Sequence, residues 1–174
     1  MGGDPTAAAR LCAACGLCCN GAMFHKVILQ PGDSAHELRA LGLKIKRKKG
    51  QFTMSQPCSA YCEGQCSIYA QRPQRCRLFE CRQLLRLAQG EITESAAMEK
   101  IQDALRKLAL VSELLAQAGE TNVERPLSKR CDAITADAEN HTPEFRAALA
   151  QAMTDFDALL DQDFRISKAA PRIE

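Results

Sequence analysis

Ten cysteines in 174 residues carry most of the chemistry that this sequence can perform. Nine of them lie between Cys12 and Cys81, and four occur in the stretch CAACGLCC, residues 12–19. Thiolates bind zinc and iron–sulfur clusters. Short spacings such as C-x2-C let one tight turn direct two or more sulfur atoms at one point, which lowers the entropy cost of assembling a site. We therefore expect a metal site, with simple burial of the thiols as the alternative.

The first cysteine region contains a run with the spacing C-x2-C-x2-C at Cys12, Cys15 and Cys18. Bacterial ferredoxins open in the same way, and continue with x3-C-P. Here the next position holds Ala22 and no proline follows it, so the sequence does not predict a ferredoxin. Cys18 and Cys19 are adjacent, and neighbouring side chains usually diverge. We therefore expect them to serve two nearby sites, or one of them not to be a ligand.

The second cysteine region reads PCSAYCEGQCSIYAQRPQRCRLFEC and supplies Cys58, Cys62, Cys66, Cys76 and Cys81. Gly64 and Pro73 interrupt regular helix here, so we expect these cysteines to lie on irregular backbone. His25 is the histidine nearest to a cluster, and we interpret it as a surface or packing residue. Cys131 stands apart from the other cysteines, and we expect it to fill apolar space.

The two regions together resemble the cysteine-cluster family also called YkgJ-like, a zinc- or iron-chelating domain. Its pattern opens with C-x2-C-G-x-C-C and closes with C-x-I-Y-x-x-R-P-x-x-C-R-x-F, and both parts occur in order within residues 12–81. The resemblance implies eight metal ligands, enough for two four-thiolate sites: Cys12, Cys15, Cys18, Cys19, Cys58, Cys66, Cys76 and Cys81. Cys62 lies outside this pattern, as a possible further ligand or a bystander.

The resemblance leaves the metal open between zinc and an iron–sulfur cluster. A similar cysteine region occurs in flagellin lysine methylases, where an iron–sulfur cluster is implied. The C-x2-C-x2-C run, the adjacent fourth cysteine and nearby arginines favour at least one [4Fe–4S] cluster, with zinc as the alternative. Arg72 and Arg77 belong to the closing motif, and we expect them to donate to the sulfurs, or else to be solvated helix charges.

A basic cluster lies at residues 44–49, where the sequence predicts the tip of a hairpin. It contains Lys44, Lys46, Arg47, Lys48 and Lys49. No aromatic residue is interleaved with these charges, and a charged tip also keeps an edge strand soluble. The net charge of the chain is only +2. We therefore do not expect nucleic acid as a partner.

The pattern of apolar residues predicts a mostly α fold with irregular metal-bound loops and at most a small β-hairpin. KVIL at residues 26–29 suggests a short strand, residues 31–43 a short helix and residues 44–54 the hairpin. One helix is expected from the second cysteine region to Gly90. Two longer helices, from about residue 94 to 118 and from residue 143, should form an antiparallel hairpin joined by a polar loop. We expect a cysteine module at 1–90 and a helical hairpin at 91–174 that packs on it to form one structural unit.

Composition narrows the function classes. No apolar run approaches the roughly 20 residues of a membrane span. The start of the chain lacks a secretory signal, so we expect a cytoplasmic protein, where disulfides are rare. No H-E-x-x-H, nucleophile elbow or phosphate loop is present. The sequence therefore favours a metal-binding or accessory module with a possible protein partner. An iron–sulfur enzyme component and a purely structural zinc domain are the alternatives.

Overall fold

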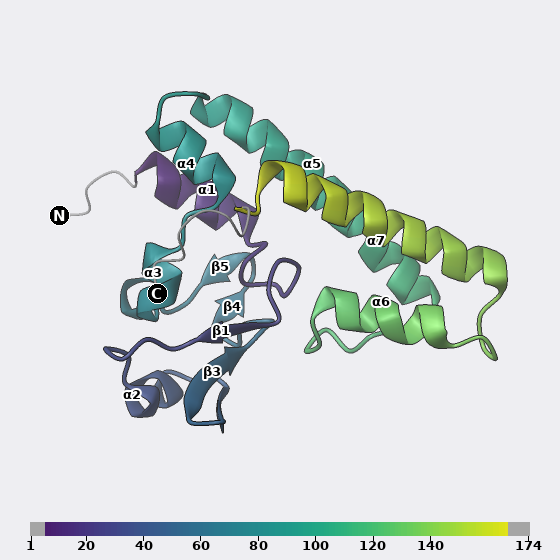
Figure 1. Cartoon of the computed structure of the whole chain (residues 1–174), viewed down its shortest axis with the longest axis horizontal. Coiled ribbons are helices and arrows are strands. Elements are labelled where there is room, and N and C mark those ends of the chain that lie inside the picture. Colours follow the sequence, from purple (N-terminus) through teal and green to yellow (C-terminus); the bar gives the residue numbers. More distant parts are fainter. Residues whose placement is uncertain (1–5, 167–174) are drawn as a thin grey trace. The chain divides into compact units, whose positions relative to one another are not determined.

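The computed structural model describes residues 6–166, which are mostly helical, as the sequence predicted. This part of the chain has seven α-helices: α1 (Ala7–Cys15), α2 (Ala35–Ala40), α3 (Gln74–Leu78), α4 (Arg82–Ala88), α5 (Glu94–Gln117), α6 (Leu127–Ala136) and α7 (Pro143–Asp163). The strands are β1 (Lys26–Ile28), β2 (Ile45–Lys48), β3 (Gln51–Ser55), β4 (Tyr61–Cys62) and β5 (Gln65–Cys66), and a 3₁₀ turn, η1, spans Tyr69–Gln71. Figure 1 shows these elements along the chain.

The chain divides into two compact units, and each is described by itself. Unit 1 comprises the described residues up to Cys15, Glu80–Glu120 and the described residues from Cys131 onward. Unit 2 comprises Gly16–Phe79 and Thr121–Arg130.

In unit 1 the long helices α5 and α7 pack side by side and run in opposite directions (Figure 1). This confirms the predicted antiparallel pair. Thr93 begins α5 because its hydroxyl accepts a hydrogen bond from the amide of Ala96 at 3.2 Å. Thr142 begins α7 in the same way, accepting from the amide of Phe145 at 3.3 Å. These side chains satisfy amides that have no partner within the helix, and Pro143 suits the first turn because it has no amide proton to satisfy.

The connection between α5 and α7 is not the polar loop that we expected, because α6 forms within it. Cys131 lies on this helix and is 3% exposed, which agrees with its predicted packing role. The core of the helical pair is formed by buried residues that recur at helical spacing, namely Ala97, Ile101, Ala104, Val111, Leu115, Leu149, Met153, Phe156 and Leu160. Two of the buried positions in α5 hold small alanines, Ala97 and Ala104.

Unit 2 contains a three-stranded antiparallel sheet in the order β1-β3-β2. Strands β2 and β3 form the predicted hairpin, with Lys48 paired to Gln51 across a turn at Lys49 and Gly50. Both turn residues have positive φ, 49° and 80°, as a tight two-residue hairpin turn requires. The expected strand at residues 26–29 adds β1 to this hairpin, so the sheet is larger than the single hairpin that the sequence predicted.

A compact apolar core stabilises unit 2. Its fully buried members come from α2, from the sheet and from the second cysteine region: Leu38, Leu43, Ile45, Met54, Ala60 and Ile68. Helix α2 begins at Ser34, whose hydroxyl accepts from the amide of Glu37 at 3.2 Å, as the sequence predicted. Core residues therefore lie within the second cysteine region itself, which places its thiols close to apolar packing.

Three local predictions about the cysteine regions were wrong. Cys12 and Cys15 lie on helix α1, because the turn that we expected around them begins only at Gly16. The segment from Tyr61 to Cys66 is a small β4–β5 hairpin and not irregular backbone. The predicted helix leading to Gly90 is broken, since α3 ends at Leu78 and α4 begins at Arg82.

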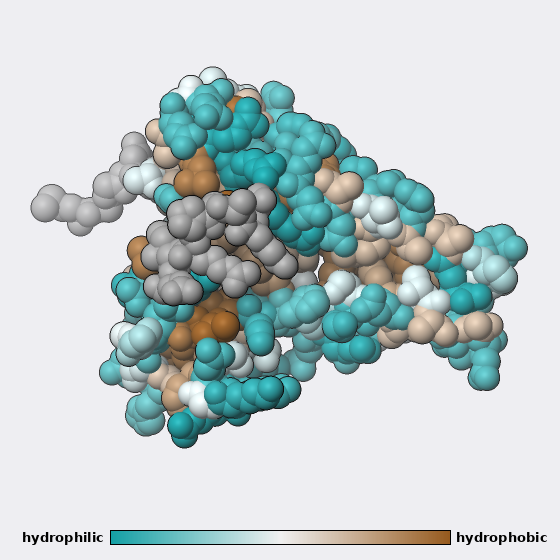
Figure 2. Space-filling model, in the orientation of Figure 1, coloured by the Kyte–Doolittle hydropathy of each residue, from teal (hydrophilic) through white to brown (hydrophobic). Residues whose placement is uncertain are grey.

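The surface of the chain is mostly hydrophilic in the view of Figure 2, with smaller areas of apolar side chains. In unit 2 the exposed large hydrophobic residues include Ile28, Tyr69 and Leu78. Among residues 6–166, no helix combines the length and apolar character that crossing a membrane requires.

Candidate metal centre

Three contacts join the first cysteine region to the second within unit 2. The amide of Cys58 donates a hydrogen bond to the carbonyl oxygen of Cys19 at 2.8 Å. On one side of this bond Gly21 lies against the ring of Pro57, and on the other Gly16 lies against Tyr61. The two segments thus run past each other in opposite directions. These backbone and side-chain contacts bring Cys19 and Cys58, which are far apart in the sequence, next to each other.

Only glycine fits at position 16, for two independent reasons. Its φ is +63°, a conformation that residues with a side chain rarely adopt. In addition, a Cβ atom built on Gly16 would lie 1.9 Å from the Tyr61 hydroxyl oxygen, far inside contact distance. The sequence predicted a turn at this glycine. It gave no signal that Tyr61 fills the space, because the two residues lie in different motifs.

Three thiols of the second region pack against the core of unit 2: Cys58, Cys66 and Cys76, each of them partly buried. Burial raises the pKa of Cys58, and the negative charge of the Cys66 thiolate adds to this rise against opposing hydrogen bonds from the backbone. Burial also raises the pKa of Cys76 to about 11, and the neighbouring Cys58 and Cys66 act in the same direction. The three sulfurs therefore lie close enough that their negative charges oppose one another.

Helix α3, which carries Cys76, is fixed to the loop before α2 by Asp33. One carboxylate oxygen of Asp33 accepts from the amide of Gln74 at 2.8 Å, and the other accepts from the amide of Gln30 at 2.8 Å. Both oxygens thus satisfy backbone amides, one of them at the start of α3. Asp33 was not identified from the sequence, since nothing in its neighbourhood resembles a motif.

Cys62 lies on β4, paired with Gln65 of β5, the residue before Cys66, and its side chain is exposed. Its Sγ is 3.9 Å from the carbonyl oxygen of Ser59. The hairpin turn at Glu63 and Gly64 has positive φ at both residues, 50° and 78°, which suits a tight turn. Cys62 also adds to the negative charge felt by Cys58, so it lies at the edge of the same group of thiols.

The two arginines of the closing motif differ in their surroundings. Arg72 is half-buried, stacks on the ring of Tyr69 and acts on Cys76 as a positive charge that opposes the rise in its pKa. Arg77 is exposed, and within residues 6–166 its side chain forms no hydrogen bond or ion pair. Of the two arginines singled out in the sequence, Arg72 is the one whose charge acts on Cys76.

Of the remaining predicted ligands, Cys18 belongs to unit 2, where its Sγ lies 4.0 Å from the sulfur of Met23, and Cys12, Cys15 and Cys81 belong to unit 1. Helix α1, which carries Cys12 and Cys15, is attached to α5 by Arg10, whose guanidinium forms two hydrogen bonds of 2.7 and 2.6 Å with the Glu94 carboxylate. This contact holds the pKa of Glu94 below its usual value. The contact therefore fixes the helix on which two predicted ligands lie.

Cys81 is the residue before α4, and the start of this helix is bound to the end of α7. The backbone amide of Arg82 donates a hydrogen bond to the carbonyl oxygen of Phe164 at 2.9 Å. The side-chain amide of Gln83 donates a hydrogen bond to the backbone carbonyl oxygen of Asp163 at 2.6 Å. Burial raises the pKa of Cys81, against the opposing effect of the amides of Leu84 and Gln83.

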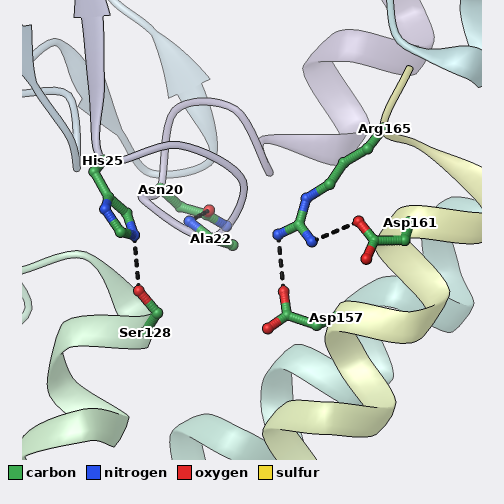
Figure 3. Close-up of polar contacts among 7 residues, drawn as sticks. All are labelled: Asn20, Ala22, His25, Ser128, Asp157, Asp161 and Arg165. Carbon is green, nitrogen blue, oxygen red and sulfur yellow. Dashed lines mark hydrogen bonds and ion pairs between the residues drawn. The ribbon is translucent and has the colours of Figure 1, made fainter. Parts of the chain in front are cut away.

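The end of α7 is itself fixed by charge. Figure 3 shows Arg165 with its two guanidinium nitrogens directed at Asp157 and Asp161, each at 2.8 Å. These contacts fix the last turns of α7, and carbonyl oxygens at the end of α7 accept the hydrogen bonds from the start of α4. The position of Cys81 therefore depends on packing within unit 1.

The His25 side chain contacts Ser128, in agreement with the surface or packing role that we expected for it. Figure 3 shows its ring directed at Ser128, with 2.7 Å between Nε2 and Oγ. In the loop before it, the side-chain oxygen of Asn20 accepts from the amide of Ala22 at 3.0 Å, which closes the turn after Cys19 (Figure 3).

The thiols suit a metal ion by their chemistry. Zinc and iron both bind thiolate sulfur, and a cation among these thiols would offset the mutual repulsion that adds to the burial-driven rise in the pKa values of Cys58 and Cys76. Within residues 6–166, no three His, Cys, Asp or Glu side chains already have the arrangement of a metal site. Three partly buried thiols nevertheless lie on one apolar core.

One protein family matches the chain. Its model, CxxCxxCC, is described as "Putative zinc- or iron-chelating domain" and matches residues 11–103, which include both cysteine regions and the first part of α5. No curated protein and no solved structure shows significant similarity to the chain. The matched segment covers more than half of the sequence and confirms the resemblance carried by the cysteine motifs. The chain therefore belongs to the CxxCxxCC family of zinc- or iron-chelating domains.

Proposed function

We propose that this protein is a metal-binding accessory module whose centre in unit 2 is formed by the thiolates of Cys58, Cys66, Cys76 and Cys19. The observation that carries this proposal is the packing of the first three thiols on one core, where their charges act on one another. Isolated buried thiols need no such proximity. A shared cation explains why so many ionisable sulfurs are gathered at one place.

Cys19 is the fourth ligand in this proposal because its backbone is hydrogen-bonded to that of Cys58. Cys62 is the competing choice, since it also lies near Cys58. It is exposed, whereas Cys19 is partly buried, and a ligand shielded from water holds a metal more firmly. Binding requires the four sulfurs to turn toward one another, which rotation about the side-chain bonds allows.

Either zinc or iron suits such a centre, because four thiolates bind both. Zinc would stabilise the fold of unit 2, since structural zinc sites contribute on the order of 10 kcal/mol to folding in small domains. A [4Fe–4S] cluster is the second candidate. It is favoured by the positive charge of Arg72, which acts on Cys76 and would stabilise added negative charge on a reduced cluster.

The experiment is purification under strict exclusion of air, from cells with ample iron and zinc, followed by measurement of iron, acid-labile sulfide and zinc per chain. A zinc centre predicts colourless protein with stoichiometric zinc and no sulfide. A cluster predicts brown protein with equal amounts of iron and sulfide. Protein that retains neither metal, and that takes up neither when supplied with it, would contradict the proposed function.

A further inference from the structure

A strongly basic surface lies along strand β2 and its turn in unit 2. Residues 38–62 contain no Asp or Glu, whereas Arg39 and every residue from 46 to 49 are basic and exposed. We call these five residues the basic edge. The neighbouring Lys44 already pairs with Glu124 at 2.6 Å. Within residues 6–166 no residue of the basic edge forms an ion pair, so its positive charge is not neutralised by this part of the chain.

Two arginines of the basic edge are held on one aromatic ring. The central guanidinium carbons of Arg39 and Arg47 lie 5.6 and 5.4 Å from the centroid of the Phe52 ring. Arg47 is paired with Phe52 across β2 and β3, and Arg39 reaches the same ring from α2. Arg39 also donates a hydrogen bond to the carbonyl oxygen of Ile45 at 3.1 Å. Guanidinium groups held in this way lose less freedom when they bind an anion, and they suit carboxylates, which they bind with two parallel hydrogen bonds.

The backbone of β2 is open on the side away from β3. The sheet has the order β1-β3-β2, so β2 is an edge strand. The carbonyl oxygen of Lys44 accepts from the amide of Ser55 at 3.3 Å, and the alternation of an antiparallel pair then directs the backbone groups of Ile45 and Arg47 outward. Arg39 occupies the outward carbonyl of Ile45, but the amide and carbonyl of Arg47 have no partner within residues 6–166. An extended segment of another chain can pair with such an edge.

The charges of the basic edge restrict what can pair with it. A second copy of this edge would place like charges together, which is a common way in which proteins prevent edge strands from associating. An acidic segment meets the opposite situation, because its carboxylates neutralise the charges that repel other strands.

Nucleic acid fits the basic edge less well than an acidic protein segment does. Phe52 is the one aromatic residue of β2 and β3, and its ring is engaged by two guanidinium groups, so it is not free to stack a base. The net charge of the chain is also only +2. An open strand edge, in contrast, is a feature that recognises a peptide backbone.

We infer that the basic edge is a docking site for an extended acidic segment of a partner protein. The segment lies beside β2, pairs with the backbone of Arg47, and places its carboxylates on the guanidinium groups of Arg39 and Arg47. This inference goes beyond the metal centre, and it does not depend on which metal the thiols bind.

The test is the binding of a fluorescent, capped eight-residue peptide, in which Glu and Thr alternate, to the full-length chain at low ionic strength. Alternation places all the carboxylates on one face of an extended strand. Fluorescence anisotropy should show saturable binding, and Arg39→Gln and Arg47→Gln should each weaken it about fivefold. Lys26→Gln is the matched control, because it removes an exposed charge from β1 at the opposite edge of the same sheet, and it should change binding by less than about twofold.

Two further probes separate strand pairing from simple attraction between charges. The same peptide with methylated backbone amides keeps its carboxylates but cannot donate to β2, and it should bind about tenfold more weakly. A single-stranded oligonucleotide of eight thymidines should bind more weakly than the acidic peptide.

Several results would overturn the inference. These are an absence of saturable peptide binding, equal losses in Lys26→Gln and Arg47→Gln, equal binding of the methylated peptide, and tighter binding of the oligonucleotide. Should either glutamine variant fail to fold, Arg47→Lys decides instead. It keeps the charge but not the planar guanidinium, so it should bind the peptide about threefold more weakly, and unchanged binding would contradict the docking site.

Discussion

The amide of Cys58 lies 2.8 Å from the carbonyl oxygen of Cys19 and donates a hydrogen bond to it, so the two cysteine regions meet through their backbones. A backbone contact does not depend on the state of the sulfurs. It positions both thiols before any metal arrives, and it therefore lowers the entropy cost of forming the centre. The following predictions test this preorganisation and the metal site that depends on it.

Gly16→Ala should destabilise unit 2 and reduce its metal binding. The substitution introduces strain at a positive φ, which costs roughly 1–2 kcal/mol, and a clash with the Tyr61 hydroxyl, which adds roughly 1–3 kcal/mol. Gly50→Ala is the matched control, because Gly50 also has positive φ but has no atom within 4 Å of an added Cβ. Chemical unfolding of both variants gives the difference in free energy.

The Tyr61 clash is isolated by a second substitution. Gly16→Ala combined with Tyr61→Ala should recover part of the stability that Gly16→Ala alone loses, because the hydroxyl is no longer in the way. If Gly16→Ala and Gly50→Ala destabilise equally, the packing of Tyr61 on Gly16 does not matter. The contact would then have no role in joining the two regions.

Cys19→Ser should reduce the metal bound per chain much more than Cys62→Ser. The first removes a proposed ligand, and the second removes an exposed thiol at the edge of the group. Metal analysis of both variants, purified in parallel, measures the difference. A larger loss of metal in Cys62→Ser than in Cys19→Ser would make Cys62 the fourth ligand and would contradict the proposal.

Part of this architecture could be predicted from the sequence, because local signals specify it. Thr93, Thr142 and Ser34 begin helices with hydroxyls that accept from backbone amides, and Lys49-Gly50 forms the expected turn. These features depend on residues close together in the chain. Apolar spacing likewise identified α5 and α7, since their length makes the period clear.

The rest depends on contacts between distant residues. The space beside Gly16 is filled by Tyr61, and α3 begins on a carboxylate supplied by Asp33. Spacing within one motif does not reveal such partners. The β4–β5 hairpin is too short to have a recognisable alternation of apolar residues. The motif identified both Arg72 and Arg77 as candidates, but its spacing could not show that Arg72 is the one that stacks on Tyr69.

The metal-free chain should lose stability as the pH rises from about 9 to about 11. The pKa of Cys76 in the fold is raised from 9.0 to about 11, so the fold favours the neutral thiol. This contribution is complete below pH 9 and is lost as the pH passes through 11. It amounts to roughly 2–3 kcal/mol for Cys76.

Unfolding by denaturant at pH 8.5 and pH 10.5, with and without Cys76→Ser, measures this effect. The variant should depend less on pH than the parent, because serine does not ionise in this range. Cys62→Ser is the matched control and should retain the full dependence, since Cys62 is exposed. The same pH dependence in Cys76→Ser as in the parent would contradict the burial of an ionisable thiol at this position.

Removal of the metal by a chelator should loosen unit 2 more than the helical pair of unit 1. The β4–β5 hairpin and α3 are short elements that carry proposed ligands. Helices α5 and α7 have their own apolar core and carry none. Amide hydrogen exchange before and after chelation should therefore accelerate most around Cys66 and Cys76. If amide exchange accelerated equally in α5, the metal would not be stabilising unit 2 in particular, and this prediction would be wrong.

The most direct test of the central claim is the metal bound per chain in matched serine variants of the anaerobically purified protein. We predict that Cys58→Ser, Cys66→Ser and Cys76→Ser each lose most of the metal of this centre. Cys131→Ser should retain the metal content of the parent, because Cys131 is 3% exposed on helix α6 and lies outside both cysteine regions. Full retention of metal in all three variants of unit 2, or a loss in Cys131→Ser as large as theirs, would contradict the account.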